Sequence, residues 1–169
     1  MAIIEVEITS DILETARRKA NKLGALRNSI TEGDGNLAGF IGEAIANSVI
    51  NGELANTYDY DILGTDGVKY DVKTKRCTSA PKPHYECSVA AFNTKQACDV
   101  YVFTRVWFDI SRRPRWRGGY ILGYMEKQEF YRRARKLNRG DIDPSNNFVV
   151  KADCYNIKIS DIKQFGEKK

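Results

Sequence analysis

The sequence predicts an α/β fold with a mixed central β-sheet flanked by helices, and three observations lead to this prediction. Two segments near the N-terminus repeat apolar residues at helical spacing. Several segments between residues 58 and 125 are rich in β-branched and aromatic residues, as strands are. A third helical pattern follows them. With 169 residues and 42% hydrophobic composition, the chain can bury one core but is short for two. We therefore expect a single domain over residues 1–169.

The first two elements are predicted helices. Residues 12–28 place apolar side chains near helical spacing, and Ser10 and Asp11 are candidates for the N-terminal cap. Residues 31–36 contain two glycines and are expected to interrupt the helical pattern. Residues 37–52 then form a second apolar arc, which an Asn-Gly pair ends. Both segments are expected to flank the sheet.

Glu43 falls outside the apolar arc of the second predicted helix. Its neighbours on the helix surface are Gly39 and Asn47, which leave this part of the surface thin. We expect the Glu43 carboxylate to face a cleft rather than the core. An ordinary exposed helix glutamate is the alternative.

Residues 58–76 are predicted to form a β-hairpin with one ionic face. Residues 58–62 alternate aromatic or apolar side chains with aspartates, and residues 64–67 supply turn chemistry. In the following strand Val68, Tyr70 and Val72 point to one side. The charged side chains that share the other side are Lys69, Asp71, Lys73 and Lys75.

The rest of the chain is predicted to supply further strands and one helix. Residues 81–97 are ambiguous, whereas residues 98–108 are typical of a central strand. Residues 119–125 are expected to form the next strand. Residues 126–140 show helical spacing and end on a glycine, and residues 146–160 are typical of short strands.

The ionic face of the hairpin predicts a metal site. Carboxylates that are crowded on one face repel each other, so a cation among them would relieve the fold. A hard cation such as Mg²⁺ takes oxygen ligands, which two strand carboxylates, a helix carboxylate and a backbone carbonyl could supply. Lys73 follows Asp71 on the same face, within reach of a water or a phosphate oxygen. The alternative is a solvated face whose acids and lysines pair across strands.

The order of these residues resembles the PD-(D/E)XK nucleases, the restriction-endonuclease-like superfamily. Residues 119–130 and 154–160 also resemble small phage-borne members of it. In that superfamily a helix glutamate precedes a strand aspartate and a strand that ends in D/E-x-K, followed by a helix and a further strand. The residues that match in this order are Glu43, Asp61, Asp71 and Lys73. The resemblance implies a restriction-endonuclease-like core and a DNA endonuclease that hydrolyses phosphodiester bonds.

The resemblance also implies a role for each matching residue. Glu43, Asp61, Asp71 and the carbonyl of Val72 would hold Mg²⁺, for which Mn²⁺ would substitute. Lys73 would orient or activate the attacking water. Asp59 shares the parity of Asp61, so either aspartate can be the ligand, although the apolar residues after Asp61 favour it. Gln96 resembles a helix glutamine that some members place after the lysine strand.

Positive charge is concentrated in one part of the sequence. The net charge is +5, but residues 105–139 contain eleven Lys or Arg against three acidic residues. Part of this excess lies in a predicted loop between two strands, and the predicted helix at 126–140 adds to it. Guanidinium groups suit phosphate oxygens, so we expect salt-dependent binding of nucleic acid, with a dimer contact as the alternative. The expected nucleic-acid-binding residues are Lys75, Arg76, Arg112, Arg113, Arg115, Trp116 and Arg117.

The remaining expectations concern partners and location. The sequence has no apolar run of membrane-span length and no signal-peptide pattern at its start, so we expect no membrane partner. For the same reasons we expect an intracellular, cytoplasmic protein, which by the resemblance would belong to a bacterium or a phage-infected cell. Its partner would be double-stranded or branched DNA, and it could act as a homodimer. A catalytically silent nucleic-acid-binding module on the same fold is the alternative function.

Overall fold

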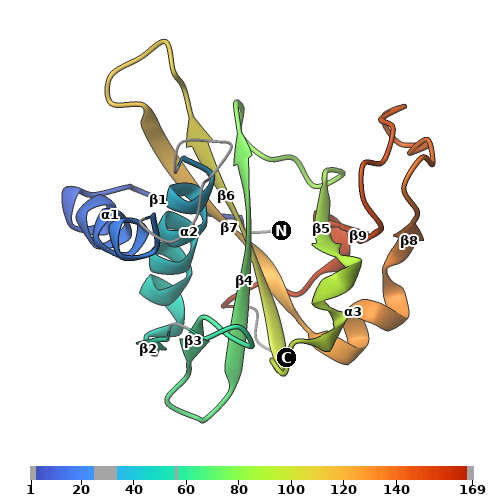
Figure 1. Cartoon of the computed structure of the whole chain (residues 1–169), viewed down its shortest axis with the longest axis horizontal. Coiled ribbons are helices and arrows are strands. Elements are labelled where there is room, and N and C mark those ends of the chain that lie inside the picture. The colour runs from blue at the N-terminus through green and yellow to red at the C-terminus, as the bar shows by residue number, and fades with distance from the viewer. Residues whose placement is uncertain (1–2, 25–33, 56, 167–169) are drawn as a thin grey trace.

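The structure, a computed structural model, describes residues 3–24, 34–55 and 57–166 (Figure 1). The described residues contain three α-helices: α1 Ser10–Gly24, α2 Asp34–Ile50 and α3 Lys127–Arg133. The two predicted N-terminal helices are confirmed, and α2 begins at Asp34, inside the expected break. Residues 25–28 of the first predicted helix and 31–33 of the break lie outside the described residues.

A six-stranded mixed sheet forms the centre of the described molecule (Figure 1). Only β4 and β6 pair in parallel, and every other neighbouring pair is antiparallel. The predicted α/β class with a mixed central sheet is therefore confirmed. In sheet order the strands are β1 Ile4–Val6, β7 Trp116–Glu126, β6 Val100–Phe108, β4 Lys69–Cys77, β3 Ile62–Leu63 and β2 Glu53–Leu54.

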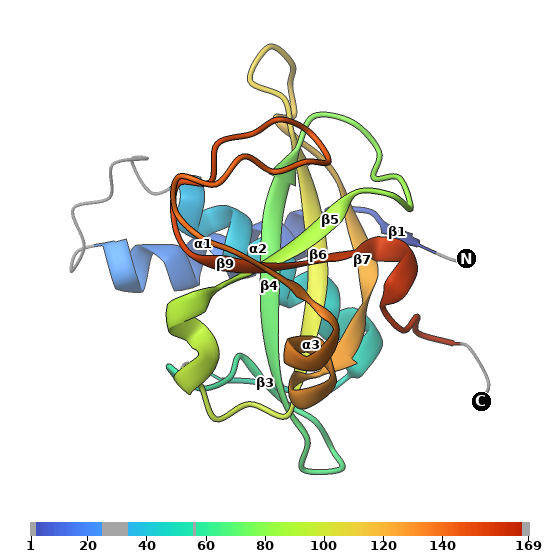
Figure 2. The ribbon, with the colours of Figure 1, turned by 90° about the vertical axis from the view of Figure 1, so that its right-hand side faces the viewer.

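A smaller antiparallel sheet crosses the long strands of the central sheet (Figure 2). It has the order β5-β9-β8, with β5 Glu86–Ala90, β9 Cys154–Lys158 and β8 Arg135–Leu137. Two 3-10 helices flank it: η1 Ala91–Lys95 follows β5, and η2 Ile159–Asp161 follows β9. The ambiguous region 81–97 therefore becomes β5 and η1.

The central sheet is covered on both faces (Figures 1 and 2). Helices α1 and α2 lie on one face, and the small sheet with α3 lies on the other. Successive residues of β6 serve the two sides in turn, because Val102 and Val106 pack toward α2, while Tyr101 and Phe103 pack toward the small sheet and α3.

Three predicted elements differ from the structure. The short strands expected over residues 146–160 are reduced to one strand, β9, which is followed by η2. Residues 58–61 do not form a strand, because the Thr57 hydroxyl donates to the Tyr60 carbonyl at 2.9 Å and accepts from the Tyr60 N–H at 3.0 Å. Such local bonding competes with a strand ladder. The helix predicted at 126–140 ends at Arg133, after which the chain extends and β8 pairs with β9. Tertiary pairing thus overrides the helical spacing.

Helix α2 lies very close to the central sheet at Gly42. A Cβ atom at this position would collide with the side chains of Thr74 on β4 and Thr104 on β6. These two hydroxyls are 2.8 Å apart and form a hydrogen bond to each other. Because Gly42 has no side chain, α2 can pack against the parallel strand pair β4 and β6. The next residue of the helix, Glu43, is thereby brought close to β4.

Candidate active site

Glu43 lies on α2 and is buried, with 8% of its surface exposed. The Lys19 ammonium of α1 contacts Glu43 Oε2 at 2.6 Å and also donates to the Ala55 carbonyl at 3.1 Å. Burial raises the pKa of Glu43 above its ordinary value, although Lys19 opposes this shift. The carboxylate faces a neighbouring acidic side chain rather than the solvent.

That neighbour is Asp61, the residue immediately before β3. Its Oδ2 accepts the backbone N–H of Val72 at 2.8 Å. The Asp61 carboxyl group interacts electrostatically with both Glu43 and Asp71. Burial, and then the charge of Glu43, raise the pKa of Asp61 to about 7.

Asp71 completes the row of carboxylates from β4, where it is 3% exposed. Its Oδ2 lies 2.6 Å from Lys73 Nζ, and its Oδ1 accepts Gln96 Nε2 at 3.3 Å. Burial, and then the charge of Asp61, raise the pKa of Asp71 to about 6. Within the described residues, Asp71 Oδ2 has no aligned hydrogen-bond donor despite the close ammonium.

Gln96 holds Lys73 in place. Lys73 Nζ donates to Gln96 Oε1 at 3.1 Å and lies over the Tyr101 ring, 5.6 Å from its centroid. Gln96 Nε2 also donates to the Tyr58 carbonyl at 2.8 Å. Gln96 follows η1 as its C-terminal cap instead of lying within an α-helix, and it bridges β4 to the 58–61 segment.

Asp59 and Asp61, which the sequence left as alternative ligands, have different partners in the structure. Asp59 Oδ1 accepts the Ala97 N–H at 3.0 Å, so this side chain fastens the 58–61 segment to the end of η1. Asp61 contacts the other two carboxylates instead. The geometry therefore brings together Glu43, Asp61, Asp71 and Lys73, with Gln96 beside them, and leaves Asp59 in a structural contact.

The donor types in this row suit a hard divalent cation, because they are all carboxylate oxygens. The N–H and C=O of one strand residue point to the same side, so the Val72 carbonyl is directed toward Asp61. Across the residues that the structure describes, no group of three or more His, Cys, Asp or Glu side chains is arranged as a metal cage. Lys19 and Lys73 neutralise the two outer carboxylates in this arrangement.

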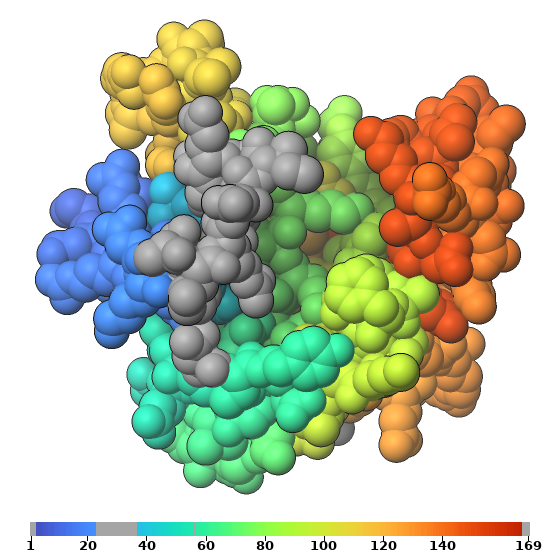
Figure 3. Space-filling view, viewed as in Figure 1, coloured from blue at the N-terminus to red at the C-terminus, as the bar shows by residue number. Residues whose placement is uncertain are grey.

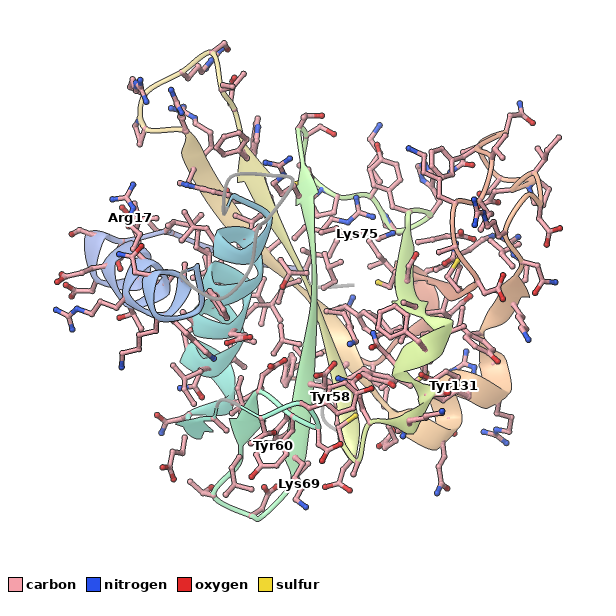
Figure 4. The ribbon with its side chains drawn as sticks, in the orientation of Figure 1. Arg17, Tyr58, Tyr60, Lys69, Lys75 and Tyr131 are labelled. Atoms are coloured by element: carbon pink, nitrogen blue, oxygen red, sulfur yellow. The ribbon has the colours of Figure 1, made fainter. Side chains whose placement is uncertain are left out.

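The predicted nucleic-acid-binding residues divide into three places. Lys75 and Arg76 are exposed on β4, beyond Lys73, and Lys75 extends toward β5 (Figure 4). Arg112, Arg113 and Arg115 lie in the hairpin connection between β6 and β7, and Arg117 lies at the start of β7. Arg112, Arg113 and Arg117 are exposed.

Trp116 corrects one of these expectations. It is 7% exposed and its ring packs against Phe108, with centroids 4.5 Å apart. Trp116 belongs to the apolar cluster between the helices and the central sheet, so its ring is not on the surface for stacking on bases. The alternation of arginine with tryptophan reflects a strand whose sides face solvent and core in turn.

Two functional candidates were missed by the sequence argument. Lys19 lies on the polar side of α1, where its pairing with Glu43 depends on how two helices pack. Arg105 is the parallel-register partner of Lys75 on β6. The sequence shows that Arg105 is a charged residue in an otherwise apolar strand, but it does not show that Lys75 lies beside it.

Comparisons with known proteins give no family assignment. No family model matches the chain, and a search of curated proteins also finds no match. Within the described residues, no helix has the length and apolar character that crossing a membrane requires.

Proposed function

We propose that this protein is a Mg²⁺-dependent DNA endonuclease with a restriction-endonuclease-like core. The observation that supports it most is the electrostatic coupling of Glu43, Asp61 and Asp71, which come from three separate segments, together with the contact of Asp71 with Lys73. Buried carboxylates in mutual contact disfavour folding, and strongly shifted groups of this kind are typical of functional sites. In a metal-dependent hydrolase the bound cation would offset the repulsion among these carboxylates.

The element order adds support. A helix with Glu43, a strand preceded by Asp61 and a strand with Asp71 and Lys73 follow one another, and β6 then pairs in parallel with β4. Between β4 and β6 the chain forms β5 and η1, where the superfamily pattern has a helix.

In the proposed reaction the chain's own residues position the substrate. Glu43, Asp61, Asp71 and the Val72 carbonyl would hold Mg²⁺, with Mn²⁺ as a substitute. When bound, the ion would polarise a phosphoryl oxygen and lower the pKa of the attacking water. Lys73 would donate to the attacking water, and Gln96 would keep its ammonium beside Asp71. Exposed arginines of the β6–β7 turn would contact DNA phosphates.

A silent nucleic-acid-binding module is the second candidate. It is favoured by the two lysines, because Lys19 and Lys73 already neutralise the outer carboxylates without a metal. In that case the acidic row would be structural, and DNA binding would not lead to cleavage.

Cleavage assays separate the two functions. Purified protein is incubated with supercoiled plasmid and with a branched oligonucleotide in EDTA, Mg²⁺ or Mn²⁺. We expect metal-dependent nicking that is lost in Lys73→Ala and Asp71→Asn. Lys69→Ala is the matched control, since Lys69 is an exposed lysine at the first position of the same strand (Figure 4). DNA binding without cleavage under any metal would favour the silent module.

A further inference from the structure

A cavity of about 650 Å³ lies beside the candidate active site, between the central sheet and the small sheet. Its walls come from β4, β5, β6 and β9 and from the 143–152 segment. Figure 3 shows this face hollowed between that segment, in orange and red, and the green segments beside it. The volume is typical of a site for a small ligand and is far too small for a duplex.

Two adjacent cations form the inner wall. Lys75 and Arg105 are register partners on β4 and β6, and both line the cavity. Lys75 is exposed at the cavity mouth, but desolvation by the surrounding walls, and then the charge of Arg105, lower its pKa. Lys75 Nζ donates to Ser88 Oγ at 2.9 Å. Arg105 Nη2 donates to the Glu86 carbonyl at 3.0 Å, while its buried Nε has no hydrogen-bond partner within the described residues. These groups are arranged to accept an anion.

The two acidic residues of the cavity, Glu86 and Asp143, share an ion pair with one arginine outside its lining. Arg135 Nη2 contacts Glu86 Oε1 and Asp143 Oδ1, each at 3.0 Å. Lys151 and Lys158 also line the cavity and add to its positive charge. The field inside the cavity is therefore set by its cations.

The remaining walls suit a base. Arg105 Cζ lies over the Tyr85 ring, 5.3 Å from the ring centroid. Phe148 is 52% exposed at the rim, beside Lys151. Asn156 is fixed in orientation, since its Oδ1 accepts Ser88 Oγ at 2.6 Å and its Nδ2 donates to Glu86 at 3.0 Å. Aromatic rings beside a cationic groove are the usual means of binding unpaired nucleotides.

The cavity is connected to the candidate active site. A smaller hollow of about 170 Å³ is lined by Lys73 and Lys75 and shares Ser88 and Arg105 with the large cavity. Asp71, Lys73 and Lys75 follow one face of β4, so Asp71 and Lys75 are separated by about 13 Å along the strand. A strand placed at Asp71 and Lys73 can therefore continue into the cavity.

We propose that this cavity binds an unpaired nucleotide of the DNA strand that is cut, with its phosphate on Lys75 and Arg105 and its base beside Phe148. This assignment rests on the proposed nuclease function and specifies its substrate class, namely DNA with a single-stranded part next to the cleavage site. The shared chemistry, a phosphate joined to a base, is also that of a free nucleotide, so the test includes one.

The test measures binding in EDTA, where no cleavage is needed. Fluorescence anisotropy gives the Kd for a blunt duplex and for the same duplex with a single-stranded tail. We expect the tail to improve the affinity of the wild type about tenfold, in line with stacking of one base. Phe148→Ala and Lys75→Gln should reduce this ratio to near one while the proteins keep their thermal transitions.

Two matched variants serve as controls. Phe92→Ala removes an exposed phenylalanine on η1, and Lys69→Gln removes an exposed lysine of β4, both outside the cavity lining. Both should keep the tail preference. Equal affinity for blunt and tailed duplexes in the wild type, or an unchanged ratio in Phe148→Ala and Lys75→Gln, would overturn the proposal.

A free nucleoside monophosphate completes the design. If it stabilises the wild type but not Phe148→Ala, and the tail preference is absent, the cavity binds free nucleotides and the strand assignment is wrong. Tail preference without metal-dependent cleavage would contradict the proposed nuclease function alone. Cleavage without tail preference would contradict this inference alone.

Discussion

The Asp61 carboxylate accepts the Val72 N–H at 2.8 Å, at the point where the β3–β4 ladder ends. The last backbone bond of this pair runs from the Asp61 N–H to the Tyr70 carbonyl. Asp61 thus makes the last backbone hydrogen bond of the pair, and its side chain binds the next free N–H of β4. This arrangement fixes the Asp61 carboxylate between Glu43 and Asp71 and explains how three acids from separate segments meet.

The metal-free protein is expected to lose stability as the pH rises from about 4 to about 7. The folded-state pKa values of Asp61, about 7, and Asp71, about 6, lie above the ordinary value of 3.8. The folded state therefore binds protons more tightly, and the resulting stabilisation is complete below about pH 4 and is lost as the pH passes through 6 to 7. Urea unfolding in EDTA across this range measures the effect.

Asp61→Asn should flatten this pH dependence. At about pH 8 the variant should exceed the wild type in free energy of unfolding by on the order of 2 kcal/mol, since one pKa unit corresponds to about 1.4 kcal/mol. Asp66→Asn, in the exposed β3–β4 turn, is the control and should follow the wild type. A wild-type stability that rises toward pH 8 would contradict the expectation.

Mg²⁺ is expected to stabilise the folded protein without DNA. At a concentration of about ten times its Kd, the thermal midpoint should rise by roughly 3 to 6 °C, because the ion relieves repulsion among carboxylates and binds the folded state. Asp71→Asn should abolish most of the rise, whereas Asp66→Asn should keep it. Differential scanning fluorimetry with Mg²⁺ and with matched ionic strength of NaCl tests this.

Lys19→Met is expected to destabilise the protein by about 1 to 3 kcal/mol at neutral pH, because it leaves the Glu43 carboxylate without its cation. The double variant Lys19→Met/Glu43→Gln should recover much of this loss. Arg18→Met, which breaks the exposed pair with Glu14, should change stability by less than about 0.5 kcal/mol. A double variant no more stable than Lys19→Met would show that the two residues are not coupled.

Gly42→Ala is expected to cost about 2 kcal/mol or more. Its new methyl group would collide with the buried, hydrogen-bonded side chains of Thr74 and Thr104. Gly39→Ala lies one turn earlier in α2, where an added Cβ meets no atom of the described residues within 4 Å. It should stabilise the helix by about 0.5 to 1 kcal/mol. Opposite shifts of the urea midpoints would verify the close packing of α2.

Arg112→Ala/Arg113→Ala is expected to lower the salt dependence of DNA binding. Each lost phosphate contact reduces the slope of log K against log salt by about 0.9, so the double variant should lose up to about two units. Arg17→Ala/Arg18→Ala removes the same charge from exposed residues of α1 (Figure 4) and should leave the slope unchanged. Equal effects of both pairs would point to net charge rather than to a specific surface.

The local patterns were sufficient to predict much of the fold. The parity of β4 places Val72 in the core and Asp71 with Lys73 on the opposite side, as alternation predicts. The strand at 98–108 and the helices at the N-terminus also follow from their periodicity. These elements are regular over many residues, so their local preference and their packing agree.

The elements that were mispredicted depend on contacts between distant residues. Leu137 matches the helical spacing of Phe130, yet it belongs to β8, because β9 supplies a partner strand. The choice between Asp59 and Asp61 has the same origin, since the Ala97 N–H binds one and the Val72 N–H binds the other. Parity alone treats both aspartates alike.

The strand order has a consequence for synthesis on the ribosome. Ile4 of β1 pairs with Ile121 of β7, and β4 pairs in parallel with the later strand β6. Until β6 and β7 leave the ribosome, β1 has no sheet partner and α1 and α2 lack much of the apolar surface that they cover. Pairings between such distant segments form slowly and leave intermediates exposed. The early part of the nascent chain is therefore expected to need protection from aggregation until β7 has been made.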